Sequence, residues 1–473
     1  MEILETLRAV IGPSYVLTGK STEKWARDWT GKYAWTPLAV VRPASTVEVS
    51  AVASACYAAG AAMVPVGGNT GLTGATKAQG VVMVSLDRLN AIRAIKPESR
   101  VAVVEGGAIL DTIHSAAADH DLIFPLTFGA RGSAMIGGNL ATNAGGSNVL
   151  RYGNTRDLCL GLEIVLPDGR IMDLMSELRK DNTGYDLRHL FIGSEGTLGF
   201  ITAAVLKLFP APCIRATAMV ALSRIEDTLP LLNALQAATG GAVEAFEFMP
   251  RNYIERHIAH TGEREPFAEA HRVNILLEAA STRADDAAPG EDGTPALTGL
   301  LQTILADEMG AGRITDAVVA QNEAQRKAMW ARREMAAELT FYDRPIVDTD
   351  IAVPVDSVPE FLARARARVT EIDPGCEDFM VSHLGDGNVH YSVYTTSGDA
   401  GLYDRIVEAV EDVTLSLGGS FSAEHGIGLS KLASMSRRKD DTALEVMQAM
   451  KAALDPKGLM NPGKVLPAPR EDP

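Results

Sequence analysis

The chain has 473 residues, of which 46% are hydrophobic, so it is too long for one core of ordinary size and we expect two or three domains. Its 60 acidic and 44 basic residues give a net charge of −16 at pH 7. This balance argues against a surface for nucleic acid or anionic membranes, and an anionic substrate must be attracted by local cations.

Cysteine usage and the N-terminus indicate where the protein works. The four cysteines form no Cys-x-x-Cys pair, so the sequence predicts neither a disulfide framework nor an iron–sulfur cluster. Residues 1–5 are partly acidic and lack the basic region and apolar run of a signal peptide. No stretch approaches the roughly 18 apolar residues of a transmembrane segment. We therefore expect a cytoplasmic protein without a membrane span.

The first predicted elements lead to a glycine-rich loop. A strand is expected at 35–43, and Ser45 with Glu48 forms a capping box for a helix that ends near Gly60. The next strand, 62–66, runs directly into the loop 67–74. Glycines let a backbone approach a ligand closely, and successive N–H groups in such a loop can bind a pyrophosphate.

The glycine loop is not of the nicotinamide-binding Rossmann type. That motif requires a helix straight after the loop, but here another strand, 81–85, follows. The loop also lacks the Gly-x4-Gly-Lys-Ser/Thr pattern of a P-loop. A second glycine-rich region at 129–147 follows a predicted strand at 101–105 and a helix at about 108–120. Single glycines are typical of ordinary turns, but together the two regions predict a groove for a long cofactor.

The pattern of predicted elements changes after residue 212. A hairpin at 162–174 and a strand at 201–209 end at Pro210-Ala211-Pro212, where we place a domain boundary. Beyond it, helices are expected at 225–238, 298–309 and 316–337, and strands at 272–278, 351–353, 379–381 and 389–393. These elements favour an α+β domain with an antiparallel sheet. Arg333 lies on one of the helices, where a surface ion pair is the commoner explanation, but an acidic enzyme that handles an anion needs a guanidinium.

Histidines and carboxylates gather in two short segments near the C-terminus. His383 and His390 flank a Gly-Asp-Gly turn that can bring both imidazoles to one point, and Glu424 can add an oxygen. Such a three-ligand site stays open to substrate, and His425 is then free to move a proton. A lone His-x6-His arises often by chance, but three of the nine histidines fall in these two glycine-bearing segments, which favours a metal site.

Taken together, these segments resemble the FAD-linked oxidases and dehydrogenases of the vanillyl-alcohol-oxidase type, also called the p-cresol methylhydroxylase type. Within them the chain is most similar to the D-2-hydroxyacid dehydrogenases. The resemblance is carried by residues 65–74, 132–146, 180–199, 383–390, 424–428 and 454–461. It implies an α+β protein with a two-subdomain FAD-binding domain at 1–212, an α+β cap domain with an antiparallel sheet at 213–425, and a segment at 426–473 that returns to the FAD-binding domain.

The resemblance also implies roles for individual residues. The residues expected to contact FAD are Pro65, Gly67, Gly68, Asn69, Thr70, Gly71, Gly132, Ser133, Gly138, Asn139, Thr142, Gly145, Ile201 and Asn461. Asn69 stands where some relatives tether the flavin through a histidine, so the FAD is expected to be noncovalent. The residues matching the ligands of a divalent metal, usually zinc, are His383, His390 and Glu424. His425 matches the catalytic base, Asn388 a substrate contact and Arg333 the carboxylate-binding arginine.

The implied reaction is oxidation of a D-2-hydroxy acid to a 2-oxo acid, with hydride passing to the flavin N5. Hydroxyglutarate-specific members have a lysine at the position of Asp348 and a threonine at that of Ala337. Because a carboxylate at 348 should repel a distal carboxylate, D-lactate or a similar short monocarboxylate is the predicted substrate. D-2-hydroxyglutarate dehydrogenase and the glycolate oxidase flavin subunit are the alternatives.

Two other classes of protein use some of the same residues. A metal-dependent hydrolase would leave the glycine-rich half unexplained, and a noncatalytic electron-transfer subunit would not need the metal ligands and the base. The electron acceptor stays open between a quinone, a cytochrome and an electron-transfer flavoprotein. A homodimer is compatible with the sequence.

Overall fold

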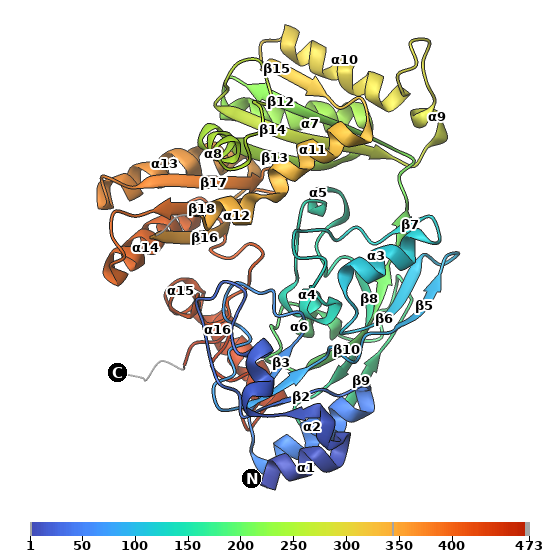
Figure 1. Ribbon diagram of the computed structural model, residues 1–473, viewed down its shortest axis with the longest axis vertical. Coiled ribbons are helices and arrows are strands. Elements are labelled where there is room, and N and C mark those ends of the chain that lie inside the picture. Colours follow the sequence, from blue (N-terminus) through green and yellow to red (C-terminus); the bar gives the residue numbers. More distant parts are fainter. Residues whose placement is uncertain (1, 343–344, 469–473) are drawn as a thin grey trace.

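The computed structural model describes residues 2–342 and 345–468, so the predicted C-terminal segment 426–473 extends beyond the described residues at 469–473. The chain forms two halves that lie one above the other in Figure 1. The lower half holds the first two main sheets, and the upper half is built around a single large sheet (Figure 1). Within the described residues, no helix has the length and apolar character needed to span a bilayer.

A four-stranded sheet opens the lower half. Its order is β1 (Val16–Leu17), β2 (Ala39–Val41), β4 (Val82–Ser85) and β3 (Met63–Val66), with α1 (Glu2–Ile11) and α2 (Thr46–Ala59) packed on it. The predicted cap of α2 is confirmed, because Ser45 Oγ accepts the Glu48 N–H at 3.1 Å and Gly60 ends the helix at φ 66°. Strands β3 and β4 are parallel neighbours joined by the glycine loop, without the helix of a Rossmann motif.

A five-stranded antiparallel sheet completes the lower half. Its order is β5 (Ile92–Lys96), β6 (Val101–Glu105), β10 (Phe200–Lys207), β8 (Cys159–Val165) and β9 (Ile171–Leu174). The helices of this part are α3 (Leu110–Ala118), α4 (Ile136–Thr142), α5 (Val149–Tyr152) and α6 (Arg188–Phe191), and a two-stranded ribbon pairs β7 (Leu122–Ile123) with β11 (Phe209–Pro210). The predicted hairpin at 162–174 corresponds to β8 and β9.

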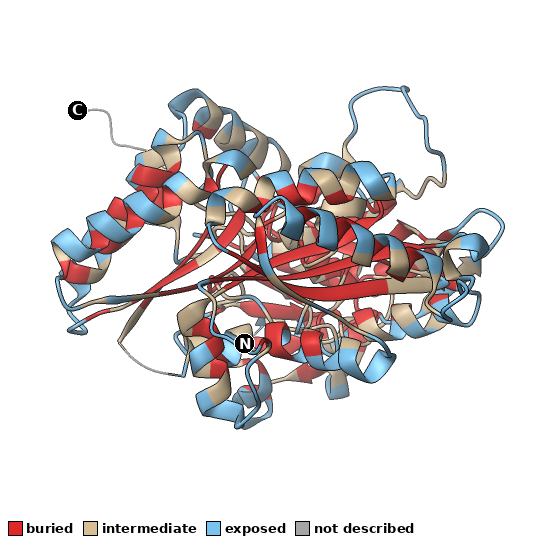
Figure 2. Ribbon diagram, turned by 90° about the horizontal axis from the view of Figure 1, so that it is seen from above, coloured by how far each residue is buried: buried red, intermediate tan, exposed pale blue. Residues whose placement is uncertain are grey.

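The upper half is a seven-stranded sheet in which every neighbouring pair is antiparallel, as predicted. Its order is β15 (Ile314–Val319), β12 (Ile214–Leu222), β14 (Val273–Ser281), β13 (Val243–Pro250), β17 (Glu377–His383), β18 (Asn388–Tyr394) and β16 (Ile346–Ala352). One face carries the larger core with α7 (Thr228–Thr239), α10 (Ala296–Gly310), α13 (Val358–Ile372) and α14 (Ala400–Ser416). The other face packs on α8 (Arg251–Thr261), α11 (Glu323–Glu334) and α12 (Ala336–Thr340). Figure 2 shows buried strands enclosed by helices whose outer sides are exposed.

The predicted helix at 316–337 is wrong over its first part. Residues 314–319 form the edge strand β15, which pairs with β12, and α11 begins only after Asn322. Asn322 caps that helix by accepting the Gln325 N–H at 3.0 Å. The β-branched residues of β15 favour an extended edge strand once β12 offers it a partner. A short helix, α9 (Ala284–Ala287), lies between β14 and α10.

The C-terminal helices α15 (Leu432–Arg438) and α16 (Asp441–Leu454) lie beside the lower half (Figure 1). Lys451 Nζ donates to the Thr197 carbonyl at 2.7 Å, and Met460 bridges to Met63 at the edge of β3. The end of the described chain is thereby attached to the four-stranded sheet, next to the glycine loop.

Candidate active site

One face of the cap sheet collects most of the predicted catalytic side chains. The antiparallel register places Glu247 opposite His383, and His383 opposite Asn388. On the next strand pair His390 stands opposite Asp350. Because directly opposite residues of paired strands point to the same face, the five side chains line one side of the sheet.

Glu424 reaches this face from the loop that follows α14. Its Oε2 lies 4.0 Å from His383 Nε2 and 3.7 Å from His390 Nε2. Ligand atoms around a tetrahedral cation with bonds near 2.1 Å are about 3.4 Å apart. The structure therefore places Glu424 close to each of the two predicted histidine ligands, at distances slightly longer than those between the ligands of a bound divalent cation.

A second donor set overlaps with the first. Ligand atoms of Asp350, His390, Glu424 and His425 all lie within 4.8 Å of one another, and His383 is not a member of this set. The Asp350 carboxylate, however, already accepts the N–H groups of Glu424 and His425, both at 2.9 Å, and the Asn388 amide at 3.0 Å. Because its oxygens already accept these hydrogen bonds, we infer that Asp350 positions the site residues and does not bind the cation. Glu424 and the two predicted histidines remain the candidate ligands.

Asp350 was missed by sequence reasoning, although it organises much of the site. Its carboxylate lies 3.6 Å from His390 Nδ1, 3.7 Å from His425 Nδ1 and 3.6 Å from Lys431 Nζ. Burial opposes its charge, but His425, Lys431 and His390 hold the pKa of Asp350 well below its ordinary value. The alternation of Asp348 and Asp350 just before the predicted strand at 351–353 was the available signal.

His383 and Arg333 share one buried carboxylate, that of Glu247. His383 Nδ1 lies 2.9 Å from Glu247 Oε1, and Arg333 Nε lies 2.8 Å from Oε2. Burial lowers the pKa of His383, but the Glu247 charge outweighs it and raises that pKa to about 9. Arg333 is only 7% exposed, and its Nη2 lacks a hydrogen-bond partner among the described residues. A buried guanidinium with unused donors suits an anionic ligand such as a carboxylate.

The Asn388 side chain points toward Asp350 on the neighbouring strand β16. Its Nδ2 donates to Asp350 Oδ1 at 3.0 Å and to the Ile351 carbonyl at 2.9 Å. Its Oδ1 is buried without a partner among the described residues. The amide oxygen is thus the atom of Asn388 left for a ligand.

The two glycine-rich regions meet in the lower half. A Cβ on Gly68 would collide with the Ser133 carbonyl, so only glycine allows these loops to lie together. The predicted FAD contacts that line one pocket there are Pro65, Gly67, Gly138, Thr142 and Ile201. Two buried amide atoms, Asn139 Nδ2 and Asn461 Oδ1, have no partner among the described residues. A close-fitting backbone cradle with spare polar atoms fits a long polar cofactor.

The other predicted FAD contacts, in the glycine-rich regions and at Asn461 of the C-terminal segment, do not line that pocket. Asn69, at φ 57°, donates to the Arg27 carbonyl at 2.8 Å and accepts from Thr76 at 2.7 Å, so its side chain shapes the loop. Asn461 Nδ2 donates to the carbonyls of Ala75 and Glu195. The remaining residues of the set are Thr70, Gly71, Gly132 and Gly145.

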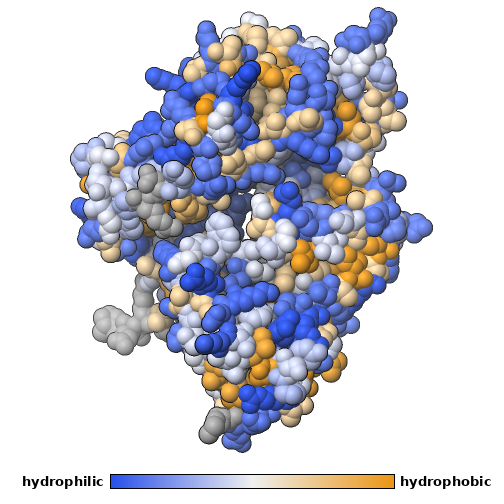
Figure 3. All heavy atoms as spheres, in the orientation of Figure 1, coloured by the Kyte–Doolittle hydropathy of each residue, from blue (hydrophilic) through white to orange (hydrophobic). Residues whose placement is uncertain are grey.

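The candidate metal ligands adjoin the cofactor pocket. A Cβ on Gly145 would lie 2.5 Å from Glu424 Oε1, which puts this ligand directly against a predicted FAD-binding loop. Glu195, which lines the pocket, accepts the N–H groups of Ile427 at 2.7 Å and Gly428 at 2.8 Å. The loop that carries Glu424 is therefore held between the two halves, where Figure 3 shows a hollow in the surface.

Gly145→Ala is expected to weaken zinc binding about tenfold or more while the protein keeps its FAD-binding half folded. The added methyl group would push Glu424 away from His383 and His390. Zinc content after dialysis against a graded chelator series measures the effect. Gly129→Ala, whose Cβ would meet nothing within 4 Å, is the matched control, and equal zinc affinity in both variants would contradict this placement of Glu424.

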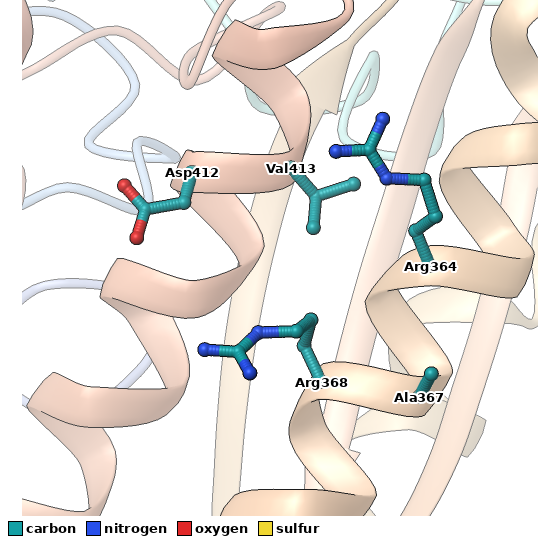
Figure 4. Close-up of a pocket in the computed structure, with 5 residues that line it drawn as sticks. All are labelled: Arg364, Ala367, Arg368, Asp412 and Val413. Carbon is teal, nitrogen blue, oxygen red and sulfur yellow. The ribbon is translucent and has the colours of Figure 1, made fainter.

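A second hollow, between α13 and α14, lies outside this site. Figure 4 shows Arg364 and Arg368 on one helix facing Asp412 and Val413 on the other. Both arginines form ion pairs on the surface of α13, Arg364 with Glu360 and Arg368 with Glu371. None of the candidate ligands or FAD contacts takes part in it.

Comparison with known proteins agrees with the geometry. Residues 37–175 match the model of an FAD binding domain, and residues 211–465 match that of the C-terminal domain of FAD linked oxidases. Among solved structures, p-cresol methylhydroxylase superposes with a TM-score of 0.75 at 14% identity, covering 100% of this chain and 97% of the other. A 4-ethylphenol oxidase from Gulosibacter chungangensis gives 0.73 at 18% identity, with 99% and 97% covered. The predicted fold is thereby confirmed, and the chain belongs to the FAD-linked oxidases.

Sequence relatives narrow the family further. A protein of Xanthomonas citri pv. viticola named D-2-hydroxyglutarate dehydrogenase is 36% identical, covering 94% of this chain and 92% of the relative. A bovine mitochondrial protein of that name is 34% identical over 98% and 83%, and one from Stutzerimonas stutzeri is 33% identical over 98% and 99%. The chain is an FAD-dependent D-2-hydroxyacid dehydrogenase, as the resemblance implied. The hydrolase and the noncatalytic subunit are set aside.

Proposed function

We propose that the protein oxidises D-2-hydroxyglutarate or a closely similar D-2-hydroxy acid to the 2-oxo acid. The names of relatives matched over nearly the whole chain support this substrate over D-lactate. The observation that carries the reaction is that Glu424, which lies against Gly145 of a predicted FAD-binding loop, approaches both His383 and His390.

Each residue of the site has a role in this proposal. Arg333 uses its free Nη2 to hold the substrate carboxylate next to the reacting carbon. His425 removes the hydroxyl proton, and its ring is oriented by Asp350 at 3.7 Å from Nδ1. The Asn388 amide oxygen, which has no hydrogen-bond partner among the described residues, would accept a hydrogen bond from the substrate near its hydroxyl group.

The two absent groups supply the remaining chemistry. A divalent cation, with zinc as the predicted metal, would be held by His383, His390 and Glu424 and would lower the pKa of the substrate hydroxyl. FAD, bound noncovalently between the glycine loops, would accept the hydride.

One residue favours a second candidate substrate. Asp348 lies on the same strand as Asp350 and the same sheet face, and its Oδ1 accepts the Ser392 hydroxyl at 2.6 Å. It stands where the resemblance places a lysine in hydroxyglutarate-specific members. An acidic group there disfavours a distal carboxylate, which keeps D-lactate as the alternative to test.

Anaerobic bleaching of the flavin absorbance near about 450 nm tests the function. The substrates to compare are D-2-hydroxyglutarate, D-lactate, L-lactate, glycolate and malate. Fastest reduction by D-2-hydroxyglutarate supports the main proposal, and fastest reduction by D-lactate supports the second. Failure of every D-2-hydroxy acid to reduce a metal-loaded, yellow protein would contradict both.

Asp348→Lys is expected to lower the KM for D-2-hydroxyglutarate about tenfold or more relative to that for D-lactate, because the lysine would attract the distal carboxylate. Steady-state kinetics with both substrates give the ratio of the two kcat/KM values. Asp348→Asn removes the charge alone and should move that ratio in the same direction but less. An unchanged ratio in both variants would mean that the distal group of the substrate does not reach residue 348.

The other properties remain proposals. The relatives named mitochondrial leave the predicted cytoplasmic location open to test by fractionation. The electron acceptor and a homodimer likewise stay predictions from the sequence.

A further inference from the structure

Glu247 lies at the contact between the metal-binding and substrate-binding parts of the site. It is 1% exposed on β13, in the interior of the cap sheet. Its two oxygens face different partners, with His383 Nδ1 at 2.9 Å from Oε1 and Arg333 Nε at 2.8 Å from Oε2. Burying a carboxylate is costly unless it is paired, and here both pairing groups belong to the proposed reaction.

Helix α11, which carries Arg333, is attached to the sheet by two such pairs. Arg326 lies seven residues before Arg333, on the same side of the helix, and binds Glu278 at 2.7 and 3.0 Å. Glu278 also accepts the Trp330 Nε1–H at 2.9 Å. Glu278 thus anchors the body of the helix, whereas Glu247 meets only the end that carries Arg333.

We propose, on the basis of the proposed function, that Glu247 is a positioning residue that couples the metal ligand His383 to the carboxylate-binding Arg333. An Nδ1–H of His383 that donates to Glu247 leaves the Nε2 lone pair for the cation. The second oxygen forms an ion pair with Arg333 Nε at 2.8 Å and so fixes the position of the guanidinium, whose Nη2 has no hydrogen-bond partner among the described residues.

This coupling selects a class of substrate. A cation held by His383 would bind the hydroxyl, Arg333 would bind the carboxylate, and Glu247 would set the spacing between the two binding groups. In a 2-hydroxy acid these groups are on adjacent carbons, whereas in a 3-hydroxy acid they are one carbon further apart. Glu247 therefore favours 2-hydroxy acids through geometry rather than through contact with the substrate.

Glu247→Gln tests the coupling, because the amide has one oxygen and can satisfy only one of the two partners. In the FAD-loaded protein we expect zinc affinity, measured by chelator competition, to fall about tenfold or more. The KM for the best D-2-hydroxy acid should rise by a similar factor, and the preference for it over the corresponding 3-hydroxy acid should shrink. FAD content should stay unchanged.

The matched control is Glu278→Gln. It removes the same charge from a buried Arg–Glu pair on the same helix and sheet face, but Glu278 has no contact with a candidate ligand in the described residues. Its zinc affinity should equal that of the wild type. Equal losses of zinc in both variants would overturn the proposal, because they would indicate general loosening of the cap.

Glu247→Asp keeps the charge and guards against a failure of Glu247→Gln to fold. The shorter side chain cannot reach both partners, so both zinc affinity and KM should change in the same direction as in Glu247→Gln, by a smaller factor. A wild type that binds zinc and turns over, with zinc affinity and KM unchanged in Glu247→Asp or Glu247→Gln, would overturn the inference. A wild type that binds no zinc would instead overturn the proposed function.

Discussion

His425→Ala is expected to slow flavin reduction by the D-2-hydroxy acid about 10³-fold or more, while the purified protein stays yellow. The substitution removes the ring that Asp350 orients but keeps the backbone contacts of residue 425. Those contacts are the N–H donated to Asp350 at 2.9 Å and the carbonyl that accepts from Thr73 at 3.4 Å. Stopped-flow reduction under anaerobic conditions gives the rate of the chemical step.

His260→Ala is the control for this loss. His260 lies on α8, paired with Glu338 at 3.0 Å on the surface of the cap, and its removal should leave the rate unchanged. FAD and zinc contents measured on the same preparations separate a lost base from a lost cofactor. Reduction of His425→Ala at close to the wild-type rate would remove His425 from its role as the base.

Removal of the metal is expected to produce the second large effect. A chelator should lower flavin reduction at least about 10²-fold, because the substrate hydroxyl would lose the cation that lowers its pKa. Zinc should restore the wild type. It should not restore Glu424→Gln, since the carboxylate at 3.7–4.0 Å from both histidines is the only one among the three candidate ligands.

Glu360→Gln, on the exposed side of α13, is the matched substitution without a ligand role. Metal analysis must accompany each rate, so that activity is compared at known occupancy. A full rate after chelation, with less than a few per cent of the zinc remaining, would show that the histidine and glutamate cluster is not needed for oxidation.

Local patterns in the sequence predicted a good part of the fold and the candidate site. The cap of α2, the glycine loop between two strands and the two-histidine turn each depend on neighbouring residues, so spacing alone was informative. Residues 316–319 were misassigned because their preference for an extended conformation depends on β12, which lies far away in the chain.

The buried carboxylates of the site could not be found in this way. Glu247 and His383 are 136 residues apart and become neighbours only through the register of β13 and β17. Glu247 could be noticed in the sequence only as one of two glutamates in a mainly apolar strand. The choice of D-lactate rested on Asp348 and Ala337, whereas the relatives matched over nearly the whole chain support the alternative.

The attachment of the Glu424–His425 loop has a consequence for how such proteins can be recombined. The lower half supplies Glu195 and Gly145, which contact the loop of the proposed third ligand and base, while the upper half supplies the two histidines. On the proposed function, neither half would carry a working centre by itself. A chimera that joins this cap to the flavin module of a distant relative would inherit the imidazoles yet misplace the carboxylate, so exchanges of specificity should be made within strands β16 to β18 rather than by swapping modules.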